Sequence, residues 1–265
     1  MPSPISRSRP DKKASLRDRH ANAVIQNNYD PDGFESENVI SITKDKAGQT
    51  VVTKTANQKL MIETLNSTFG MTKILFAVGS AGTGKTFLAT CWAVEQLRNS
   101  KASGVNKIIM LRPNVEVGKS LGFMPGTEAE KFQHYTIPFV KSLKKLIPCE
   151  KLDEMIHKEV IEMSPINFLR GDTFENAVVI VDESQNMTID EFKMILTRLG
   201  DDSRIIFTGD TSQVDLRDKK SSGLSHAMCI LKDIRGINAV EFGIEDIVRD
   251  GIVKDIIIAY QNDGK

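Results

Sequence analysis

Residues 79–86 follow the pattern Gly-x-x-x-x-Gly-Lys-Ser/Thr, which cradles nucleotide phosphates when it joins a strand to a helix. The stretch consists of Gly79, Ser80, Ala81, Gly82, Thr83, Gly84, Lys85 and Thr86, and Phe87 follows it. Glycines let successive backbone N–H groups turn inward as an anion nest, and a helix beginning here adds its positive end. We expect Lys85 to reach the β- and γ-phosphates and the Thr86 hydroxyl to ligate Mg²⁺. The pattern favours a nucleotide-phosphate site over an ordinary glycine-rich turn.

Two acids, Asp182 and Glu183, stand directly after the apolar run of residues 178–181. An acid at the end of a buried strand commonly holds Mg²⁺ opposite a phosphate-binding loop, so Asp182 is the second expected metal ligand. Glu183 is placed to accept a proton from an attacking water. This pair favours hydrolysis over transfer to a bound acceptor, and two surface acids at a strand end are the alternative.

A polar cluster at residues 208–213 follows another apolar run, residues 205–207. If both runs are strands of one parallel sheet, this cluster faces the same crevice as the acids. Gln213 could then hydrogen-bond both the γ-phosphate and the attacking water, which would make it a sensor of the nucleotide state. A plain turn is the competing interpretation.

Charge that develops on the γ-phosphoryl group needs a cation in addition to Lys85, and arginine supplies a bidentate one. Four arginines stand at or near the ends of expected elements, namely Arg112, Arg170, Arg198 and Arg249. Arg249, at the start of the last expected helix, is the first candidate and Arg198 the second. Each of them could equally be a surface salt-bridge residue. No Asn-Lys-x-Asp segment follows the loop, so nothing supports guanine specificity.

Short apolar runs alternate with helical patterns along most of the chain, which is typical of a parallel sheet covered on both faces. The expected strands are residues 74–78, 108–111, 160–163, 178–181, 205–207 and 239–242. The expected helices begin near residue 56 and span about 85–98, 130–147, 188–198, 222–232 and 249–261. Two short runs, residues 39–42 and 50–53, flank a turn and predict a hairpin. The fold class is therefore α/β, with a phosphate-binding loop after its first sheet strand and a small N-terminal hairpin.

The composition is that of a globular chain without a strong electrostatic bias. The 265 residues contain 35 Lys plus Arg and 35 Asp plus Glu, and 40% of them are hydrophobic. No apolar stretch reaches the length of a membrane span and the first residues lack a signal peptide, so we expect a cytoplasmic protein without a membrane partner. The three cysteines are far apart and predict reduced thiols.

We divide the chain into an N-terminal arm, residues 1–35, and one ATPase domain, residues 36–265, with a hairpin at 38–54 and a core at 55–265. The arm is basic and poor in apolar residues, which predicts a flexible segment. It is either a solvated tail or a contact for nucleic acid or a neighbouring subunit.

From about Ala56 to Tyr260 the sequence resembles the PhoH-like family of P-loop ATPases. Besides the loop and the two acids, the markers are Asn57-Gln58-Lys59, Leu111-Arg112-Pro113-Asn114, Leu121-Gly122-Phe123, Leu169-Arg170-Gly171, Ser184-Gln185-Asn186, Leu196-Thr197-Arg198, Thr208-Gly209-Asp210, Ser222-Gly223-Leu224 and Asp246-Ile247-Val248-Arg249.

The resemblance implies a RecA-like core similar to the first such domain of superfamily 1 helicases. It also implies that Gln58 reads the adenine edge, that Gln213 belongs to the helicase-type third motif, and that Arg249 contacts the γ-phosphate in cis. The family is associated with ATP hydrolysis, and some members with RNA or DNA unwinding or with RNA cleavage. The sequence contains no separate acidic cluster to support a nuclease.

The chain has room for only one RecA-like core, whereas two-domain helicases bind ATP between two of them. A closed head-to-tail ring would complete each site with a neighbour, so we expect a homo-oligomer, a hexamer above other sizes. Arg198 or Arg170 would then reach across the interface.

The leading hypothesis is a Mg²⁺-dependent ATPase that moves on single-stranded nucleic acid, with RNA favoured over DNA. A strand channel could be lined by basic and aromatic residues, namely Lys119, Phe123, Lys131, His134, Tyr135, Lys141, Lys144 and Lys145. A solvated helix face with core aromatics explains the same residues at least as well. The alternative function is a nucleotide-dependent switch or assembly ATPase that acts on a protein partner.

Overall fold

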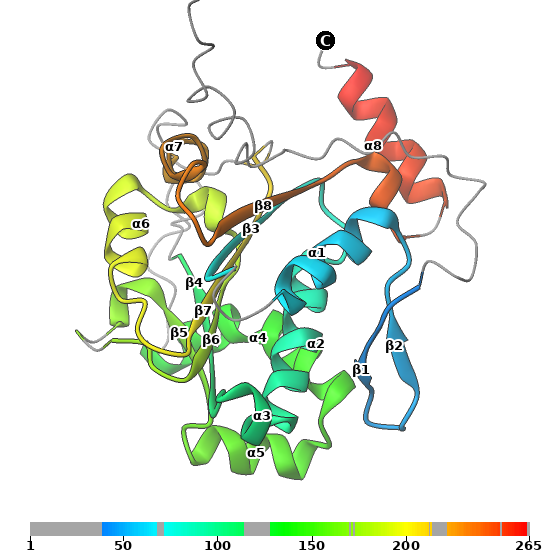
Figure 1. The fold of residues 1–265 in the computed structure, drawn as a ribbon. Helices are drawn as coiled ribbons and strands as arrows, with labels where there is room; N and C mark the ends of the chain where they lie inside the picture. The colour runs from blue at the N-terminus through cyan, green and yellow to red at the C-terminus, as the bar shows by residue number, and fades with distance from the viewer. Residues whose placement is uncertain are drawn as a thin grey trace, which may run out of the picture.

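The computed structural model describes residues 39–67, 72–113, 128–169, 171, 173–211, 213, 222–249 and 251–263. Six parallel strands form its central sheet in the order β5-β4-β6-β7-β3-β8 (Figure 1). Their bounds are β3 (Ile74–Gly79), β4 (Lys107–Arg112), β5 (Ile161–Pro165), β6 (Ala177–Val181), β7 (Arg204–Gly209) and β8 (Ile237–Phe242). All six expected strands are confirmed, and the phosphate-binding pattern follows β3, as predicted.

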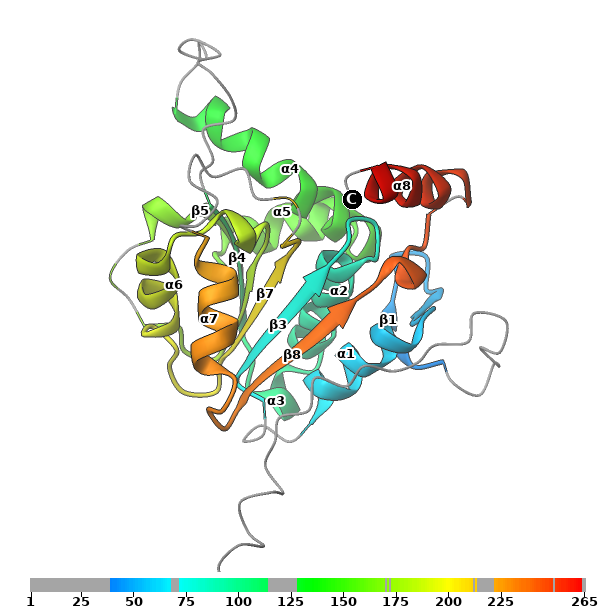
Figure 2. The same ribbon diagram turned by 90° about the horizontal axis from the view of Figure 1, so that it is seen from above.

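Helices cover both faces of this sheet, because the strands are apolar on both sides (Figure 2). One face packs against α1 (Ala56–Asn66), α2 (Lys85–Arg98), α4 (Glu128–Leu146) and α5 (Cys149–His157), and the other against α6 (Ile189–Leu196) and α7 (Gly223–Leu231). Along β3 the side chains alternate, since Leu75 and Ala77 face the first layer and Phe76 and Val78 the second. The predicted two-sided α/β sheet is confirmed.

Several short elements were not predicted. They are α3 (Ser100–Ser103), α5, and the 3₁₀ turns η2 (Ile166–Phe168), η3 (Ser184–Asn186) and η5 (Ile244–Asp246). The last helix, α8 (Gly251–Asp263), follows η5 and stands apart from the sheet layers (Figure 1). Within the described residues, no helix combines the length and the apolarity needed to cross a membrane.

The predicted hairpin is present as β1 (Ser41–Lys44) and β2 (Thr50–Val52), which pair antiparallel. Hydrogen bonds attach it to α2 and to the end of α4. The Thr43 hydroxyl donates to Glu95 at 2.7 Å, Arg98 donates to the Lys44 carbonyl at 2.7 Å, and the Lys46 N–H donates to the Lys145 carbonyl at 3.0 Å. The hairpin is therefore fixed to the core, and the predicted arm at residues 1–35 lies outside the described residues.

Gly79 ends β3 at a point where no side chain fits. Its φ is +137°, and an added Cβ would overlap the backbone carbonyl oxygen of Phe242 in β8. Gly48, in the hairpin turn, has a similarly positive φ of +83° but open space around it. Gly79 is therefore required both for its backbone conformation and for the close approach of β8, whereas Gly48 meets only the first requirement.

We expect Gly79→Ala to lower the free energy of unfolding by about 2–5 kcal/mol, since backbone strain and overlap add. Gly48→Ala, the matched control, should cost only about 1–2 kcal/mol from strain. Urea unfolding monitored by circular dichroism measures both values. Equal losses for the two variants would show that the contact with Phe242 is unimportant.

Candidate nucleotide-binding site

The phosphate-binding pattern forms the connection between β3 and α2 at the carboxyl edge of the sheet. Gly82 and Gly84 both have φ of +85°, a conformation that favours glycine, and Gly84 caps the N-terminus of α2. Ligands of parallel α/β sheets bind at this edge, where the helix also presents its free N–H groups. The local geometry is thus that of a strand-loop-helix anion site.

Lys85 lies inside the loop rather than in solvent. Its Nζ donates to the carbonyls of Gly79 at 2.7 Å and Ser80 at 2.8 Å, and to the Thr83 hydroxyl at 3.1 Å. Burial lowers the pKa of Lys85, and nearby carboxylates oppose this shift; they belong to Asp210, Asp182, Glu183 and Asp246. A phosphate could take over the hydrogen bonds that the carbonyl oxygens now accept, so this buried cation fits an anionic ligand.

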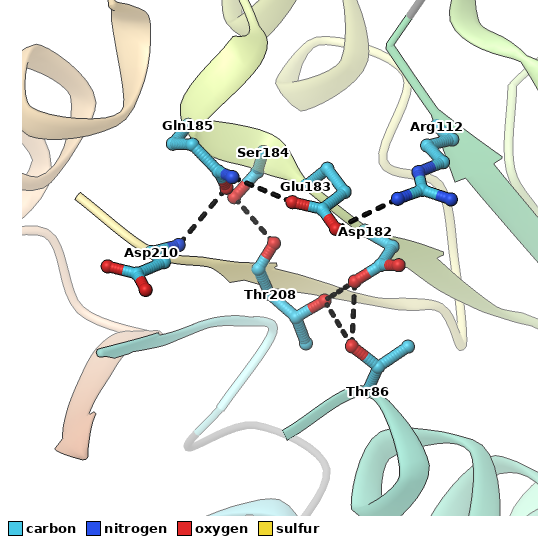
Figure 3. A network of polar contacts seen from close by, with 8 residues as sticks. All are labelled: Thr86, Arg112, Asp182, Glu183, Ser184, Gln185, Thr208 and Asp210. Carbon is cyan, nitrogen blue, oxygen red and sulfur yellow. Dashed lines mark hydrogen bonds and ion pairs between the residues drawn. The ribbon is translucent and has the colours of Figure 1, made fainter. Parts of the chain in front are cut away.

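Side-chain oxygens of Thr86, Asp182 and Thr208 meet between α2, β6 and β7 (Figure 3). The hydroxyls of Thr86 and Thr208 donate to the same Asp182 oxygen at 2.7 Å and 2.8 Å, and lie 3.3 Å from each other. Carboxylate and hydroxyl oxygens are the hard ligands that Mg²⁺ prefers. Thr86 and Asp182 are therefore suited to hold Mg²⁺ together, a role that stays a prediction, and Thr208, to which sequence analysis gave no role of its own, lies beside them.

Glu183 turns away from β6 with a φ of +54°, and two donors hold its carboxylate. Arg112 donates to Oε1 at 2.8 Å, and the Gln185 side chain donates to Oε2 at 2.7 Å. Figure 3 shows Arg112 reaching Glu183 from the end of β4, on the side away from Asp210. Since β6 and β7 lie between β4 and β3, Arg112 contacts the expected base rather than the phosphate loop.

Gln185 connects the two acidic strand ends, a role that sequence analysis did not assign. Its side chain is 1% exposed, and its Oε1 accepts the Asp210 N–H at 3.0 Å. Asp210 in turn accepts a hydrogen bond of 2.9 Å from the side chain of Gln213. The structure thereby links Glu183 to Gln213 through buried groups, which fits the sensor role proposed for Gln213 without testing it.

Gln58 lies against the loop from the first turn of α1. Its Nε2 donates to the Thr83 carbonyl at 3.0 Å, and its Oε1 accepts the Lys54 N–H at 2.7 Å. This amide therefore connects the phosphate loop to the segment that precedes α1. Its proposed contact with adenine stays a prediction.

Arg249 lies beside the loop within the same chain, and its proposed contact with the γ-phosphate stays a prediction. A Cβ placed on Gly82 would lie 2.8 Å from the Arg249 Nε, and the Val248 N–H donates to the Gly82 carbonyl at 3.3 Å. Asp246, 1% exposed, fixes this segment and was missed as a functional residue. It accepts hydrogen bonds from Thr55 at 2.5 Å, Asn57 at 2.8 Å and the Gly243 N–H at 2.9 Å.

Arg198 lies far from the loop in its own chain. It follows α6, which leads from the carboxyl edge of β6 back to the start of β7, and its carbonyl accepts the Phe174 N–H at 2.8 Å before β6. Arg198 therefore stands at the opposite edge of the sheet. Its action across a subunit interface stays a prediction, and Arg170 lies outside the described residues.

The residues proposed for a strand channel are only partly described. Lys119 and Phe123 lie outside the described residues, as do the side chains of Lys131, His134 and Tyr135. Lys141, Lys144 and Lys145 are exposed on α4, and the Lys145 Nζ lies 5.1 Å from the centre of the Phe87 ring on α2. Lys145 thus lies over an aromatic ring of its own chain, and the channel as a whole stays a prediction.

Comparison with known proteins identifies the family. A family model described as "PhoH-like protein" matches residues 50–261, and the PhoH-like protein of Bacillus subtilis (strain 168) is 40% identical over 227 residues. The chain belongs to the PhoH-like family. As a PhoH-like P-loop protein with the strand order described above, it has the expected RecA-like α/β fold and is a nucleotide-dependent P-loop enzyme.

Other relatives cover the PhoH-like chain to similar extents. The match to the Bacillus protein covers 86% of this chain and 69% of that protein. The PhoH-like protein of Mycobacterium tuberculosis (strain ATCC 25618 / H37Rv) is 40% identical over 81% of this chain and 59% of its own length. Protein PhoH of Escherichia coli (strain K12) is 38% identical over 71% of this chain and 53% of its own length. The PhoH-like chain thus matches 53–69% of the length of these relatives.

Among solved structures, the crystal structure of the DUF1998 helicase MrfA bound to DNA matches the PhoH-like chain with a TM-score of 0.41 and 10% identity. The match covers 71% of this chain and 27% of that one. A likeness this distant supports no statement about activity.

Proposed function

We propose that this PhoH-like chain hydrolyses ATP with Mg²⁺ and couples hydrolysis to binding or movement on single-stranded nucleic acid, with RNA favoured over DNA. The observation that supports hydrolysis most directly is the placement of Glu183 beside Asp182, whose carboxylate meets Thr86 of the phosphate loop. A metal ligand and a proton acceptor at one strand end, opposite a buried lysine, match the needs of an attacking water.

Each residue has a defined part in this proposal. Thr86 and Asp182 would hold Mg²⁺, which neutralises charge on the β- and γ-phosphates. Lys85 exchanges its loop carbonyls for phosphate oxygens, and Glu183 takes the proton of the attacking water. Arg249, which lies over the loop, stabilises the charge that develops on the γ-phosphoryl group.

We expect Arg249→Ala to lower kcat about 100-fold and to change the dissociation constant of ATP much less, because its contact strengthens in the transition state. Arg249→Lys should recover only part of the rate, since lysine cannot bind two oxygens at once. Steady-state ATPase assays and equilibrium ATP binding give both quantities. Arg235→Ala, at an exposed arginine before β8, is the control and should match the wild type. A loss of ATP affinity that accounts for the whole effect would assign Arg249 to binding alone.

The nucleic-acid part of the proposal is tested by measuring ATPase activity with single-stranded RNA, single-stranded DNA and no nucleic acid. We expect stimulation, strongest with RNA, that weakens steeply between about 50 and 200 mM salt as counterions compete for the contacts. No stimulation by any nucleic acid would contradict this part and favour a nucleotide-dependent switch acting on a protein partner.

We further propose that the chain works as a homo-oligomer, a hexameric ring above other sizes, because one core supplies only one side of the ATP site. Arg198 is the described residue proposed to act from a neighbouring subunit, since its position excludes a role in its own site. Analytical ultracentrifugation at several protein concentrations tests the assembly. A stable monomer with full ATPase activity would refute it.

A further inference from the structure

We propose that Arg112 and Phe168 form a contact site for single-stranded nucleic acid, and that a strand phosphate activates hydrolysis by drawing Arg112 away from Glu183. This inference rests on the proposed function, because it assigns the regulation of the same site. In this proposal, the ion pair between Arg112 and Glu183 is the resting state of the enzyme, before single-stranded nucleic acid binds.

The ion pair follows from the order of the strands. β4 and β6 are parallel neighbours, with Leu111 opposite Val181, and the Asp182 N–H donates to the Leu111 carbonyl at 2.9 Å. Arg112 directly follows Leu111, and Glu183 directly follows Asp182; the Arg112 guanidinium and the Glu183 carboxylate lie 2.8 Å apart. Arg112 donates to Oε1 and Gln185 to Oε2, so two of the about four acceptor positions of the Glu183 carboxylate are already taken when an attacking water approaches.

The two donors differ in how easily they can leave. Gln185 is 1% exposed and also holds Asp210, so its position is fixed by the core. The side chains of Arg112 and Glu183 are 24% and 39% exposed. An ion pair exposed to this degree shifts an equilibrium by no more than about fivefold, so a competing anion can displace it. Arg112 is therefore the donor that a ligand can remove.

A second feature lies on the side of Arg112 that faces away from the phosphate loop. Arg112 is paired with Pro165, the last residue of β5, and Phe168 follows three residues later in η2. Phe168 is 61% exposed, and it is the only phenylalanine among the exposed large hydrophobic side chains of the described residues. Arg112 at the end of β4 and the exposed ring of Phe168 just after the end of β5 therefore belong to neighbouring strand ends. A guanidinium and an exposed ring placed in this way suit single-stranded nucleic acid, because the first binds a phosphate and the second stacks on a base.

The positions of Arg112 and Phe168 explain why single-stranded nucleic acid and ATP would not compete for one site. Across the sheet the order is β5, β4, β6, β7 and β3. Arg112 ends β4 and Phe168 follows β5, so both lie at the ends of the two strands farthest from the phosphate loop on this side. Glu183, at the end of β6, lies between the two. A nucleic-acid phosphate bound to Arg112 would thus release the Glu183 carboxylate, which lies between Arg112 and the proposed ATP site.

The test compares the ATPase rates of the full chain with Arg112→Ala, with and without a 20-nucleotide oligouridylate or oligothymidylate. We expect Arg112→Ala to raise the rate without nucleic acid about three- to fivefold and to reduce the fold-stimulation by the oligonucleotide correspondingly. Arg112→Lys should keep the pair, and the control Arg235→Ala should match the wild type. A lower or unchanged rate for Arg112→Ala without nucleic acid would overturn the proposal, since Arg112 would then position Glu183 for catalysis or play no part.

Phe168 gives an independent readout of the strand contact. We expect Phe168→Ala to raise the oligonucleotide concentration needed for half-maximal stimulation at least about fivefold, because one stacked base is lost. Phe168→Leu keeps an apolar side chain without a ring and should behave like Phe168→Ala. Unchanged oligonucleotide concentrations for both variants would remove Phe168 from the site.

The two hypotheses fail in different ways. A wild-type enzyme that hydrolyses ATP but responds to no nucleic acid contradicts the proposed coupling, and with it the release of Arg112 by a strand. A wild-type enzyme that is stimulated, while Arg112→Ala shows no rise without nucleic acid, contradicts only the inference drawn from Arg112.

Discussion

Replacing Glu183 with glutamine is expected to lower kcat for ATP hydrolysis by about 100- to 10,000-fold while ATP binding stays close to that of the wild type. Glutamine has nearly the same shape, and it can still accept the hydrogen bond that Arg112 now donates. It cannot accept the proton of the attacking water, so only the chemical step suffers. Single-turnover hydrolysis and equilibrium binding of ATP separate the two quantities.

Glu159 provides an unusual control for this variant. It is an exposed glutamate whose φ of +55° nearly equals the +54° of Glu183, so Glu159→Gln repeats the same substitution on the same backbone conformation. We expect Glu159→Gln to retain full activity. Comparable losses in the two variants, or a Glu183→Gln enzyme that fails to bind ATP, would refute the assignment of Glu183 as the base.

Replacing Lys85 with alanine is expected to weaken ATP binding by about 100-fold or more, since each hydrogen bond to a charged group is worth about 1.5–3 kcal/mol and Lys85 would make several to phosphate. The variant should also hydrolyse ATP at a background rate. Equilibrium dialysis with ATP and Mg²⁺ measures the affinity, and circular dichroism checks the fold.

Lys85 also donates hydrogen bonds to three oxygen atoms of the loop, so the loss of ATP binding has to be separated from a loss of loop structure. Lys85→Met keeps the length of the side chain and most of its packing but removes the charge. We expect Lys85→Met to lose ATP binding as Lys85→Ala does, and Lys101→Ala on the exposed surface of α3 to lose none. Retained binding in Lys85→Met would show that the lysine supports the loop rather than the phosphates.

The elements around the loop could be predicted from sequence because their signals are local. An apolar run, a glycine-rich turn and a helix fix β3, the loop and α2 within about ten residues of one another. Thr86 and Asp182 could be paired because both follow strands of a parallel sheet, and such strand ends meet at one edge. Only the type of element and its direction were needed for these predictions.

The contacts that hold the site together depend on strand order, which local patterns do not contain. Arg112 meets Glu183 only because β4 lies next to β6. Asp246 meets Thr55 across 191 residues of sequence, because β8 lies next to β3 and brings η5 back to the start of α1. No motif spacing could have assigned either contact.

The position of Arg198 at the edge of the sheet opposite the loop could have been predicted from the sequence. A helix that follows a strand in a parallel sheet returns the chain to the opposite edge, so its last residues point away from the ligand edge. Arg198 ends such a helix, and its distance from the phosphate loop followed from the predicted order of elements alone. Arg249 differs because it begins the segment after a strand, and this places it at the ligand edge.

The position of β3 in the sheet also dictates when the nucleotide site can be completed during synthesis. Among the described strands β3 pairs only with β7 and β8, which are made more than 120 residues later, and Arg249 comes last of all. A ribosome that has just finished the phosphate loop has therefore produced a strand without partners, exposed on both edges. The growing chain therefore cannot assemble the proposed catalytic site until Arg249 has been made, and a chaperone that binds it before then would have to protect the unpaired edges of β3.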